Sequence, residues 1–286
     1  MTPADLLLLT PALRQYAALG IAAAGGVVSE RAGVVNIALE GMMLAGAFAA
    51  VWAAQVTSPA VGIAAGGAAG MVLGLVHVLL TQRLKMDHTV SGVAINLLAL
   101  NGTAFLLRQV FRQADPPREA TVVATLPIGI FVAAALALPV ALHLLLQHTR
   151  FGLRLRVSGE SPEAAAMAGV RLCPVRTIAV ALSGLLAGCA GAYLSLSLVG
   201  GFTDSMVSGR GFIALAAVVC GRWTPFGAAA AALAFGYFDA LQLRLQGAVA
   251  MPHEFLQMMP YALTILAALA FRSRPPAALG RTDIRL

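Results

Sequence analysis

The stretch AVGIAAGGAAGMVLGLVHVLLTQ, residues 60–82, decides the fold class of this chain. It contains no Asp, Glu, Lys or Arg, and about 20 apolar residues in a helix are enough to cross the ~30 Å hydrocarbon core of a bilayer. Lipid offers no hydrogen bonds to a backbone, so a lone segment crossing it must be helical. We therefore predict a transmembrane helix over residues 60–82.

The composition extends this reading to the whole chain. Of 286 residues, 59% are hydrophobic and 11% are charged, whereas about a quarter are charged in soluble domains. Further apolar runs lie at 12–29, 34–55, 90–107, 126–147, 177–200, 211–221, 225–244 and 255–271. We expect an all-α polytopic membrane protein of about 8–9 transmembrane helices, with residues 1–286 as one domain. At this length we expect no fused ATPase or soluble catalytic domain on the same chain.

The run 211–221 is too short to span a bilayer and is followed by Arg-Trp-Thr-Pro. We predict a short, broken or re-entrant helix near 211–221. Irregular backbone at membrane depth is tolerated only against protein or a water-filled cavity, so this segment is expected to line something.

The basic residues predict the orientation. With the loop 148–176 in the cytoplasm, thirteen Lys and Arg residues lie inside and six outside, as the positive-inside rule requires. The inside set is Arg31, Arg83, Lys85, Arg150, Arg154, Arg156, Arg171, Arg176, Arg222, Arg272, Arg274, Arg281 and Arg285; the outside set is Arg14, Arg108, Arg112, Arg118, Arg210 and Arg244. The C-terminus is then cytoplasmic, and the N-terminus is outside if all nine runs cross. The start lacks a basic region before its apolar run, so we expect no cleaved signal.

Glycines recur at helix-packing spacing. Gly66, Gly70 and Gly74 share one helix face, and Gly184 and Gly188 share another. Small residues let helices approach closely in lipid. We expect close packing inside one bundle rather than a dedicated dimerisation motif.

The loop 157–170 carries the marks of a short helix. Ser161 is suited to capping it, Pro162 to its first position, and Glu163 to the positive end of its dipole. Gly169 can adopt the left-handed conformation that ends it. Two turns are marginal alone in water, so the helix must dock on something. It lacks the large apolar face of an interfacial helix, which favours a groove on a partner protein.

Seven stretches together resemble one known family. They are GGVVSERAGVVNIALEGMMLAGAF (25–48), TVSGVAINLLAL (89–100), FGLRLRVSGESPEAAAMAGV (151–170), ALSGLLAGCAGAYLSL (181–196), GRGFIALAAVVCGRWTPFGA (209–228), DALQLRLQ (239–246) and RSRPPAALG (272–280). They cover about 40% of the chain. The sequence resembles the permease subunits of ATP-binding-cassette (ABC) importers for nucleosides and simple sugars, within the wider group that also carries branched-chain amino acids.

The resemblance implies a type II importer fold in a bacterial cytoplasmic membrane. It implies a second permease, in a heterodimer, together with a cytoplasmic ABC ATPase that binds ATP and Mg and an external substrate-binding lipoprotein. It also implies that the loop 157–170 is the coupling helix that enters a cleft of the ATPase. Its contact residues would be Ser161, Pro162, Glu163, Ala164, Met167 and Gly169.

Several chemistries lack their motifs in this sequence. There is no phosphate-binding G-x-x-x-x-G-K-[ST] loop, no H-E-x-x-H and no G-x-S-x-G. The three cysteines and five histidines show no metal-ligand or disulfide spacing. We therefore expect a transporter subunit without its own ATPase site, cofactor, metal or nucleic-acid partner.

Polar residues within the runs mark the candidate substrate pathway, because such residues are costly in lipid. Asn36 and Glu40 are one helical turn apart, and Glu40 either pairs with an arginine such as Arg31 or acts in the pathway. Asn96, in mid-run, is expected either to contact solute or to bond between helices.

Two further groups complete this set. Asp239 and Gln242 share a face of their run and either line the path or join helices. Phe202, with Asp204, Ser205 and Arg210, belongs to an outer loop that either meets a binding protein or is simply solvated.

The predicted function is half of the translocation pathway for a nucleoside or related simple sugar. The alternatives are a permease for a ribose-like sugar, a riboflavin-like ligand or a branched-chain amino acid, and a secondary transporter that needs no ATP. A secondary transporter should keep titratable residues near mid-membrane, whereas those here lie near the ends of their runs. An intramembrane enzyme has no recognisable constellation here.

Overall fold

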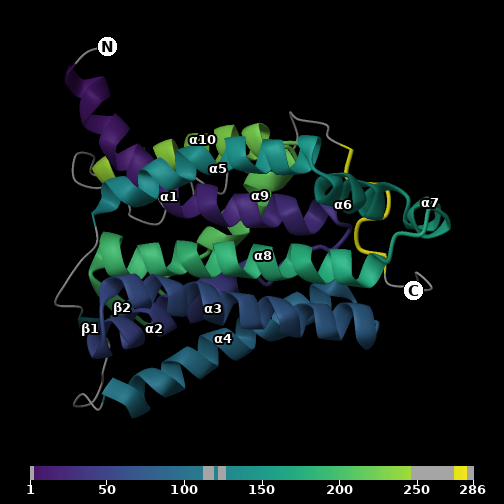
Figure 1. The fold of residues 1–286 in the computed structure, drawn as a ribbon. Coiled ribbons are helices and arrows are strands. Elements are labelled where there is room, and N and C mark those ends of the chain that lie inside the picture. The colour runs from purple at the N-terminus through teal and green to yellow at the C-terminus, as the bar shows by residue number, and fades with distance from the viewer. Residues whose placement is uncertain (1–2, 112–118, 122–126, 246–273, 282–286) are drawn as a thin grey trace.

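The structure is a computed structural model, and it describes residues 3–111, 119–121, 127–245 and 274–281. Long helices run side by side in one bundle, as Figure 1 shows. Among the described residues, six helical segments are long and apolar enough to cross a membrane: Leu39–Val56, Pro59–Arg83, His88–Val110, Ile128–His148, Leu172–Val199 and Pro225–Leu245. The all-α polytopic class is confirmed.

The elements follow the apolar runs closely. They are α1 (Pro3–Arg31), α2 (Leu39–Val56), α3 (Pro59–Val78) with a π-helical extension η1 (Leu79–Arg83), α4 (His88–Phe111), β1 (Glu119–Thr121), α5 (Ile128–His148), α6 (Arg150–Glu160), α7 (Pro162–Met167), α8 (Leu172–Tyr193) with a π-helical extension η2 (Leu194–Val199), β2 (Gly201–Thr203), α9 (Arg210–Cys220) and α10 (Pro225–Leu245). Strands β1 and β2 form one short antiparallel pair that the sequence did not suggest. The run 255–271 lies outside the described residues.

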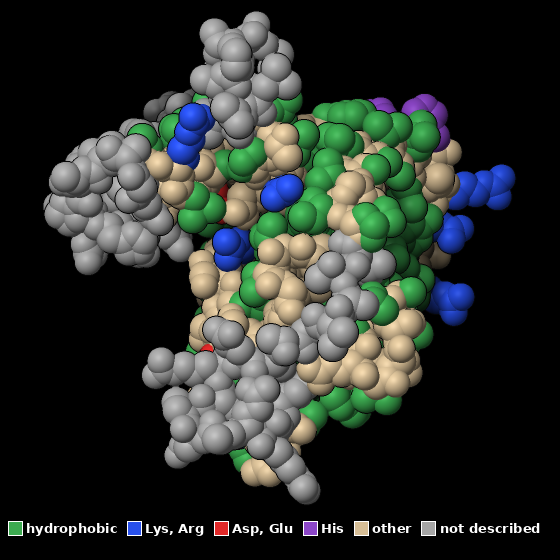
Figure 2. Space-filling model, turned by 90° about the vertical axis from the view of Figure 1, so that its left-hand side faces the viewer, with side chains coloured by type: hydrophobic (Ala, Val, Ile, Leu, Met, Phe, Trp, Pro, Cys, Tyr) green, Lys and Arg blue, Asp and Glu red, His purple; other side chains and the backbone are tan. Residues whose placement is uncertain are grey.

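The two ends of the bundle carry different elements. Elements α6 and α7 project at one end, while the N-terminus and the β1–β2 pair lie at the other (Figure 1). Figure 2 views the β1–β2 end, where hydrophobic side chains make up much of the described surface and Lys and Arg are few.

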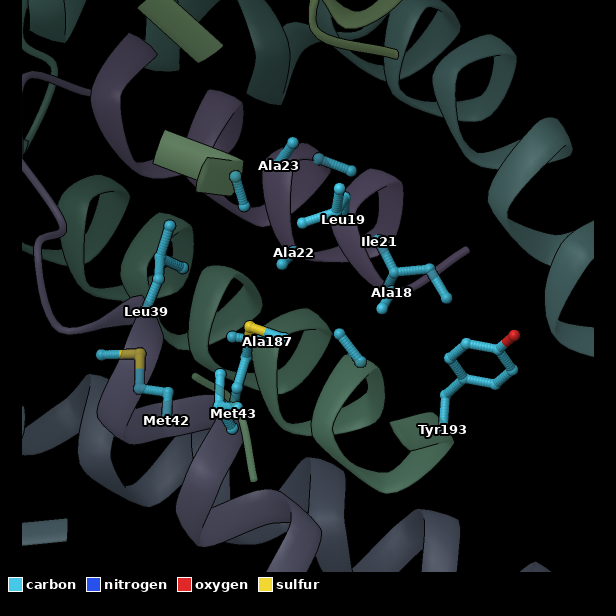
Figure 3. Close-up of a cluster of buried hydrophobic side chains, with 14 of the residues drawn as sticks. Ala18, Leu19, Ile21, Ala22, Ala23, Leu39, Met42, Met43, Ala187 and Tyr193 are labelled. Carbon is cyan, nitrogen blue, oxygen red and sulfur yellow. The ribbon is translucent and has the colours of Figure 1, made fainter. Parts of the chain in front are cut away.

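The core forms where α1, α2 and α8 meet. Leu19 of α1, Leu39 and Met43 of α2 and Tyr193 of α8 are each at most 2% exposed, and Figure 3 shows their places on these three helices. Alanines such as Ala187 fill the space between them and leave room for the helices to approach.

Helices α3 and α8 pack very closely, and their glycines allow this. A Cβ placed on Gly70 would lie 2.2 Å from the Gly184 carbonyl oxygen, and one on Gly188 would lie 2.2 Å from that of Gly66. No side chain fits at such distances. The expected packing of the two glycine faces inside one bundle is confirmed.

The run 34–55 differs from its prediction at its start. Residues 34–36 are not helical, and α2 begins only at Leu39. Gly33 has a φ of +91°, which turns the chain after α1, and side chains from α3 and α4 bond the backbone that follows. Asn36 therefore precedes the helix, and its expected place on one helix face with Glu40 is wrong.

The short run 211–221 forms α9, as predicted. Its first turn contacts the start of α2, and the turn after it contacts the end of α1. Asn36, beside this junction, donates a hydrogen bond to Ser183 of α8. At a rise of 1.5 Å per residue, Ser183 lies about 16 Å along α8 from the first residue of that helix. Helices α2 and α9 therefore both begin near the middle of the bundle.

Candidate functional site

The α6–α7 segment forms an exposed knob. Pro162 and Ala165 are buried against the body of the protein, while Glu163, Ala164 and Met167 point outward, Met167 with 84% of its surface exposed. A pocket of about 390 Å³ lies beside α7 and is lined by Ala166, Gly169, Val170, Arg171, Leu172, Cys173 and Pro174. The helix is thus anchored on one side and open on the other.

The ends of α7 agree only in part with the sequence. Gly169 adopts the expected left-handed conformation, with φ +76°, and the Val170 amide donates to the Ala165 carbonyl oxygen. The Ser161 side chain makes no capping hydrogen bond, so that prediction is wrong. The backbone carbonyl oxygen of Ser161 instead accepts the Ala165 amide at 3.0 Å.

The C-terminal segment holds this knob in place. The Ala278 amide donates to the Gly159 carbonyl oxygen at 2.9 Å, and the Gly280 amide donates to that of Gly33 at 3.0 Å. Arg281 lies 3.6 Å from the Glu163 carboxylate, although both side chains are more than half exposed. An exposed pair of this kind adds little stability.

The knob is also joined to the segment that leads into α2. The Ser158 hydroxyl donates to the Ala32 carbonyl oxygen at 3.1 Å, and a Cβ on Gly159 would lie 2.2 Å from that of Arg31. The buried Arg176 guanidinium donates to the Ser158 hydroxyl and carbonyl oxygens and to Gln82. The end of α6 and residues 31–33 therefore form one packed unit.

At mid-bundle, Glu40 binds the start of α9. Its two carboxylate oxygens accept the Gly209 and Gly211 amides, each at 2.7 Å. Gly209 has a φ of +82°, and a Cβ on Gly211 would lie 2.5 Å from the Glu40 backbone nitrogen. A helix N-terminus is positively polarised, so the carboxylate and α9 compensate one another in low-dielectric surroundings.

Glu40 does not pair with Arg31, so that expectation is wrong. The Arg31 Nε donates to the Trp223 carbonyl oxygen at 2.8 Å, and Nη1 lies 3.5 Å from Glu160. The two residues are separated because α2 begins well away from the end of α1, where Arg31 lies.

Asn36 and Asn96 lie on either side of the start of α2. The fully buried Asn36 donates to the Ser183 hydroxyl at 2.9 Å, while its Oδ1 has no partner among the described residues. Asn96 accepts the Gly41 amide at 2.8 Å and donates to the Ile37 carbonyl oxygen at 3.0 Å. Of the two roles considered for Asn96, bonding between helices is the one these contacts show.

The remaining pathway candidates are scattered. Asp239 lies 3.9 Å from Arg210, which extends the α9 junction toward α10, and Gln242 is buried one turn further on. Phe202 is fully buried and packs edge-to-face on Phe48, so its expected place in an accessible outer loop is wrong. Pairing of β1 with β2 covers this position.

One polar cluster escaped the sequence analysis. His77 bonds the Ser91 hydroxyl and the Val35 carbonyl oxygen, each at 2.9 Å, and His88 accepts the Val35 amide at 3.1 Å. These side chains satisfy backbone that α1 and α2 leave unpaired. In the sequence, the only sign of this cluster is that Gly33 directly precedes the run 34–55, where a break between helices can occur.

Comparison with known proteins identifies the family. Residues 8–268 match the family model described as the permease component of the branched-chain amino acid transport system. This chain belongs to that family, and is thus a multi-pass membrane permease.

Individual relatives agree with this assignment. The chain is 37% identical to the guanosine ABC transporter permease protein NupQ of Bacillus subtilis, over 95% of this chain and 94% of NupQ. It is 36% identical to the nucleoside ABC transporter permease protein NupC of Lactococcus lactis, over 86% of each. It is also 36% identical to the putative glucose ABC transporter permease protein TsgC13 of Haloferax volcanii, over 84% of this chain and 78% of TsgC13.

Proposed function

We propose that this chain is one of two permease subunits of a bacterial ABC importer for nucleosides, in which α7 is the coupling helix. The observation that carries the proposal is the α6–α7 knob on a chain of this family. Its outward face is small and exposed, and its inward face is fixed by Pro162 and Ala165. In this proposal a partner ATPase binds ATP and Mg, and α7 enters its cleft.

The packing supplies a route from this knob to the middle of the bundle. Motion of α6 displaces residues 31–33, because Gly159 and Ser158 contact them directly. The same segment continues through Asn36 into Glu40, where α2 and α9 begin. Two helices that start at mid-depth and share one carboxylate form a junction that can shift as a unit.

We place the solute path next to this junction, between this chain and a second permease. Glu40, Asn36 and Asn96 hold the helix starts that border it, and Asp239 and Gln242 extend it along α10. In this arrangement Asn96 acts by fixing the start of α2. An external lipoprotein would deliver solute at the end that carries β1 and β2.

The relatives favour a nucleoside over a sugar. NupQ and NupC are named for guanosine and nucleosides, and both match over more of this chain than TsgC13, which is named for glucose. A glucose-type sugar is therefore the second candidate.

The test is calorimetry with the cognate binding lipoprotein, followed by uptake into vesicles containing the full transporter. Guanosine, adenosine, ribose, glucose and leucine form the panel. We expect binding and ATP-dependent uptake of the nucleosides alone. Uptake of glucose or leucine with no nucleoside binding would overturn the assigned solute class.

A further inference from the structure

The turn between α9 and α10 has an unusual backbone. Arg222 and Trp223 have φ values of +57° and +54°, and consecutive non-glycine residues in the left-handed region are rare. Each such residue costs free energy and persists only where surrounding contacts hold it.

Strong contacts hold this turn. The Trp223 indole, 5% exposed, donates to the Glu30 carboxylate, and the Trp223 amide donates to the Val218 carbonyl oxygen at 3.0 Å. The Trp223 carbonyl oxygen accepts Arg31 Nε at 2.8 Å. Trp223 is thereby fixed inward, and the neighbouring Arg222 side chain is exposed.

Arg222 shares a pocket with two other arginines. The pocket measures about 680 Å³ and is lined by Arg31, Arg222, Thr224 and Arg274. Two carboxylates of the described residues lie near these arginines. Glu160 is 3.5 Å from Arg31, and Glu30 accepts a hydrogen bond from the Trp223 indole. Among the described residues, three guanidinium groups therefore face two carboxylates, which gives this part of the pocket a positive excess.

The start of α10 adds to this potential. Thr224 caps the helix, since its hydroxyl oxygen accepts the Gly227 amide at 3.1 Å. The positive end of a 21-residue helix thus opens at the pocket. Phe226, 51% exposed, places an apolar surface two residues further on.

We propose that this pocket binds a phosphate-bearing anion. Guanidinium groups bind phosphate oxygens through paired hydrogen bonds, and basic pockets at the ends of transmembrane helices bind anionic lipid headgroups. The adjoining exposed Phe226 favours a phospholipid of the surrounding leaflet as the source over free phosphate. The strained turn fixes Arg222 at the pocket before the anion arrives.

The experiment uses the complete purified transporter, depleted of lipid in detergent. Thermal unfolding is followed during titration with dioctanoyl phosphatidylglycerol, dioctanoyl phosphatidylcholine and, separately, inorganic phosphate. The variants are Arg222→Gln, Arg274→Gln and their double substitution. Arg83→Gln is the matched control, because Arg83 is an exposed arginine that does not line the described pocket. It lies near the same end of the bundle, next to Gln82, which accepts a hydrogen bond from Arg176.

We expect phosphatidylglycerol to raise the melting temperature of the wild-type transporter. The apparent dissociation constant from this titration should be at least tenfold larger in the double variant and unchanged in Arg83→Gln. Phosphatidylcholine should bind more weakly. Inorganic phosphate could raise the melting temperature as much as the lipid does, with the effect lost in the double variant. That result would support the anion-binding site but assign it to free phosphate instead of a lipid. The proposal is overturned if neither probe binds or if the double variant binds like the wild type. It is also overturned if the substitutions cause the ATPase subunit to dissociate from the permease without changing anion binding.

Discussion

Glu40 joins two helix starts that are far apart in the sequence. Replacement by Gln keeps the size of the side chain but leaves one amide of the Gly209–Gly211 segment facing an NH₂ group. A buried donor without an acceptor costs about 1–3 kcal/mol. We expect Glu40→Gln to lower the melting temperature and the yield of assembled transporter. Glu163→Gln, on the exposed face of α7, is the control for the melting temperature alone, because Glu163 belongs to the proposed ATPase contact. Wild-type stability in Glu40→Gln would show that the junction does not depend on this charge.

Asn96 provides a second test at the same junction. Leu has similar volume but neither accepts the Gly41 amide nor donates to the Ile37 carbonyl oxygen. Asn96→Leu should therefore reduce thermal stability and solute uptake together. If uptake alone fell and stability were unchanged, Asn96 would contact solute rather than hold α2.

At this scale the sequence identified the residues better than their partners. Glu40 and Asn96 stood out because polar groups are rare in apolar runs. Their partners are backbone amides and carbonyl groups of distant segments, which no sequence spacing indicates. Phe202 was misplaced for the same reason, because the β1–β2 pair that covers it joins residues about 80 positions apart.

Among the elements, the contact of α3 with α8 depends strictly on side-chain size. A Cβ at Gly184 would lie 2.3 Å from the Gly70 carbonyl oxygen, whereas a Cβ at Gly102 of α4 would meet no atom of the described residues within 4 Å. Gly184→Ala should lower folded yield and destabilise the protein by at least the 1–3 kcal/mol typical of overpacking. Gly102→Ala should be neutral or slightly stabilising. Equal stability of the two variants, measured by thermal unfolding in detergent, would contradict the packing described.

Element types and lengths followed from hydrophobicity, since eight of the nine runs correspond to described helices within a few residues at most ends. Within these runs, residues 34–36 are the exception, because they are apolar in pattern but not helical. Hydrogen bonds of Val35 with His77 and His88 keep them outside α2. Those side chains lie more than 40 residues away. Tertiary contacts therefore set this boundary, against the local hydrophobic pattern.

For the whole molecule, the charge asymmetry predicts which end faces the cytoplasm. Single cysteines at Ala168, beside α7, and at Ser58, between α2 and α3, test this after Cys173, Cys189 and Cys220 are replaced by serine. In intact cells we expect a membrane-impermeant maleimide to label the Ser58 position and to reach the Ala168 position only after lysis. The opposite pattern would invert the topology.

The central claim is that α7 passes the work of a partner ATPase to this chain, and the full reconstituted transporter tests it most directly. The test variant combines Glu163→Lys with Ala164→Trp, both on the exposed face of α7. The control is Arg281→Gln, which removes the exposed ion pair with Glu163 and leaves α7 itself unchanged. Guanosine uptake is measured beside ATP hydrolysis, with melting temperature as the check on folding. We predict that the α7 variant folds normally, loses at least nine-tenths of ATP-driven uptake and no longer couples hydrolysis to the binding protein, while Arg281→Gln transports normally. Normal uptake by the α7 variant would contradict the account.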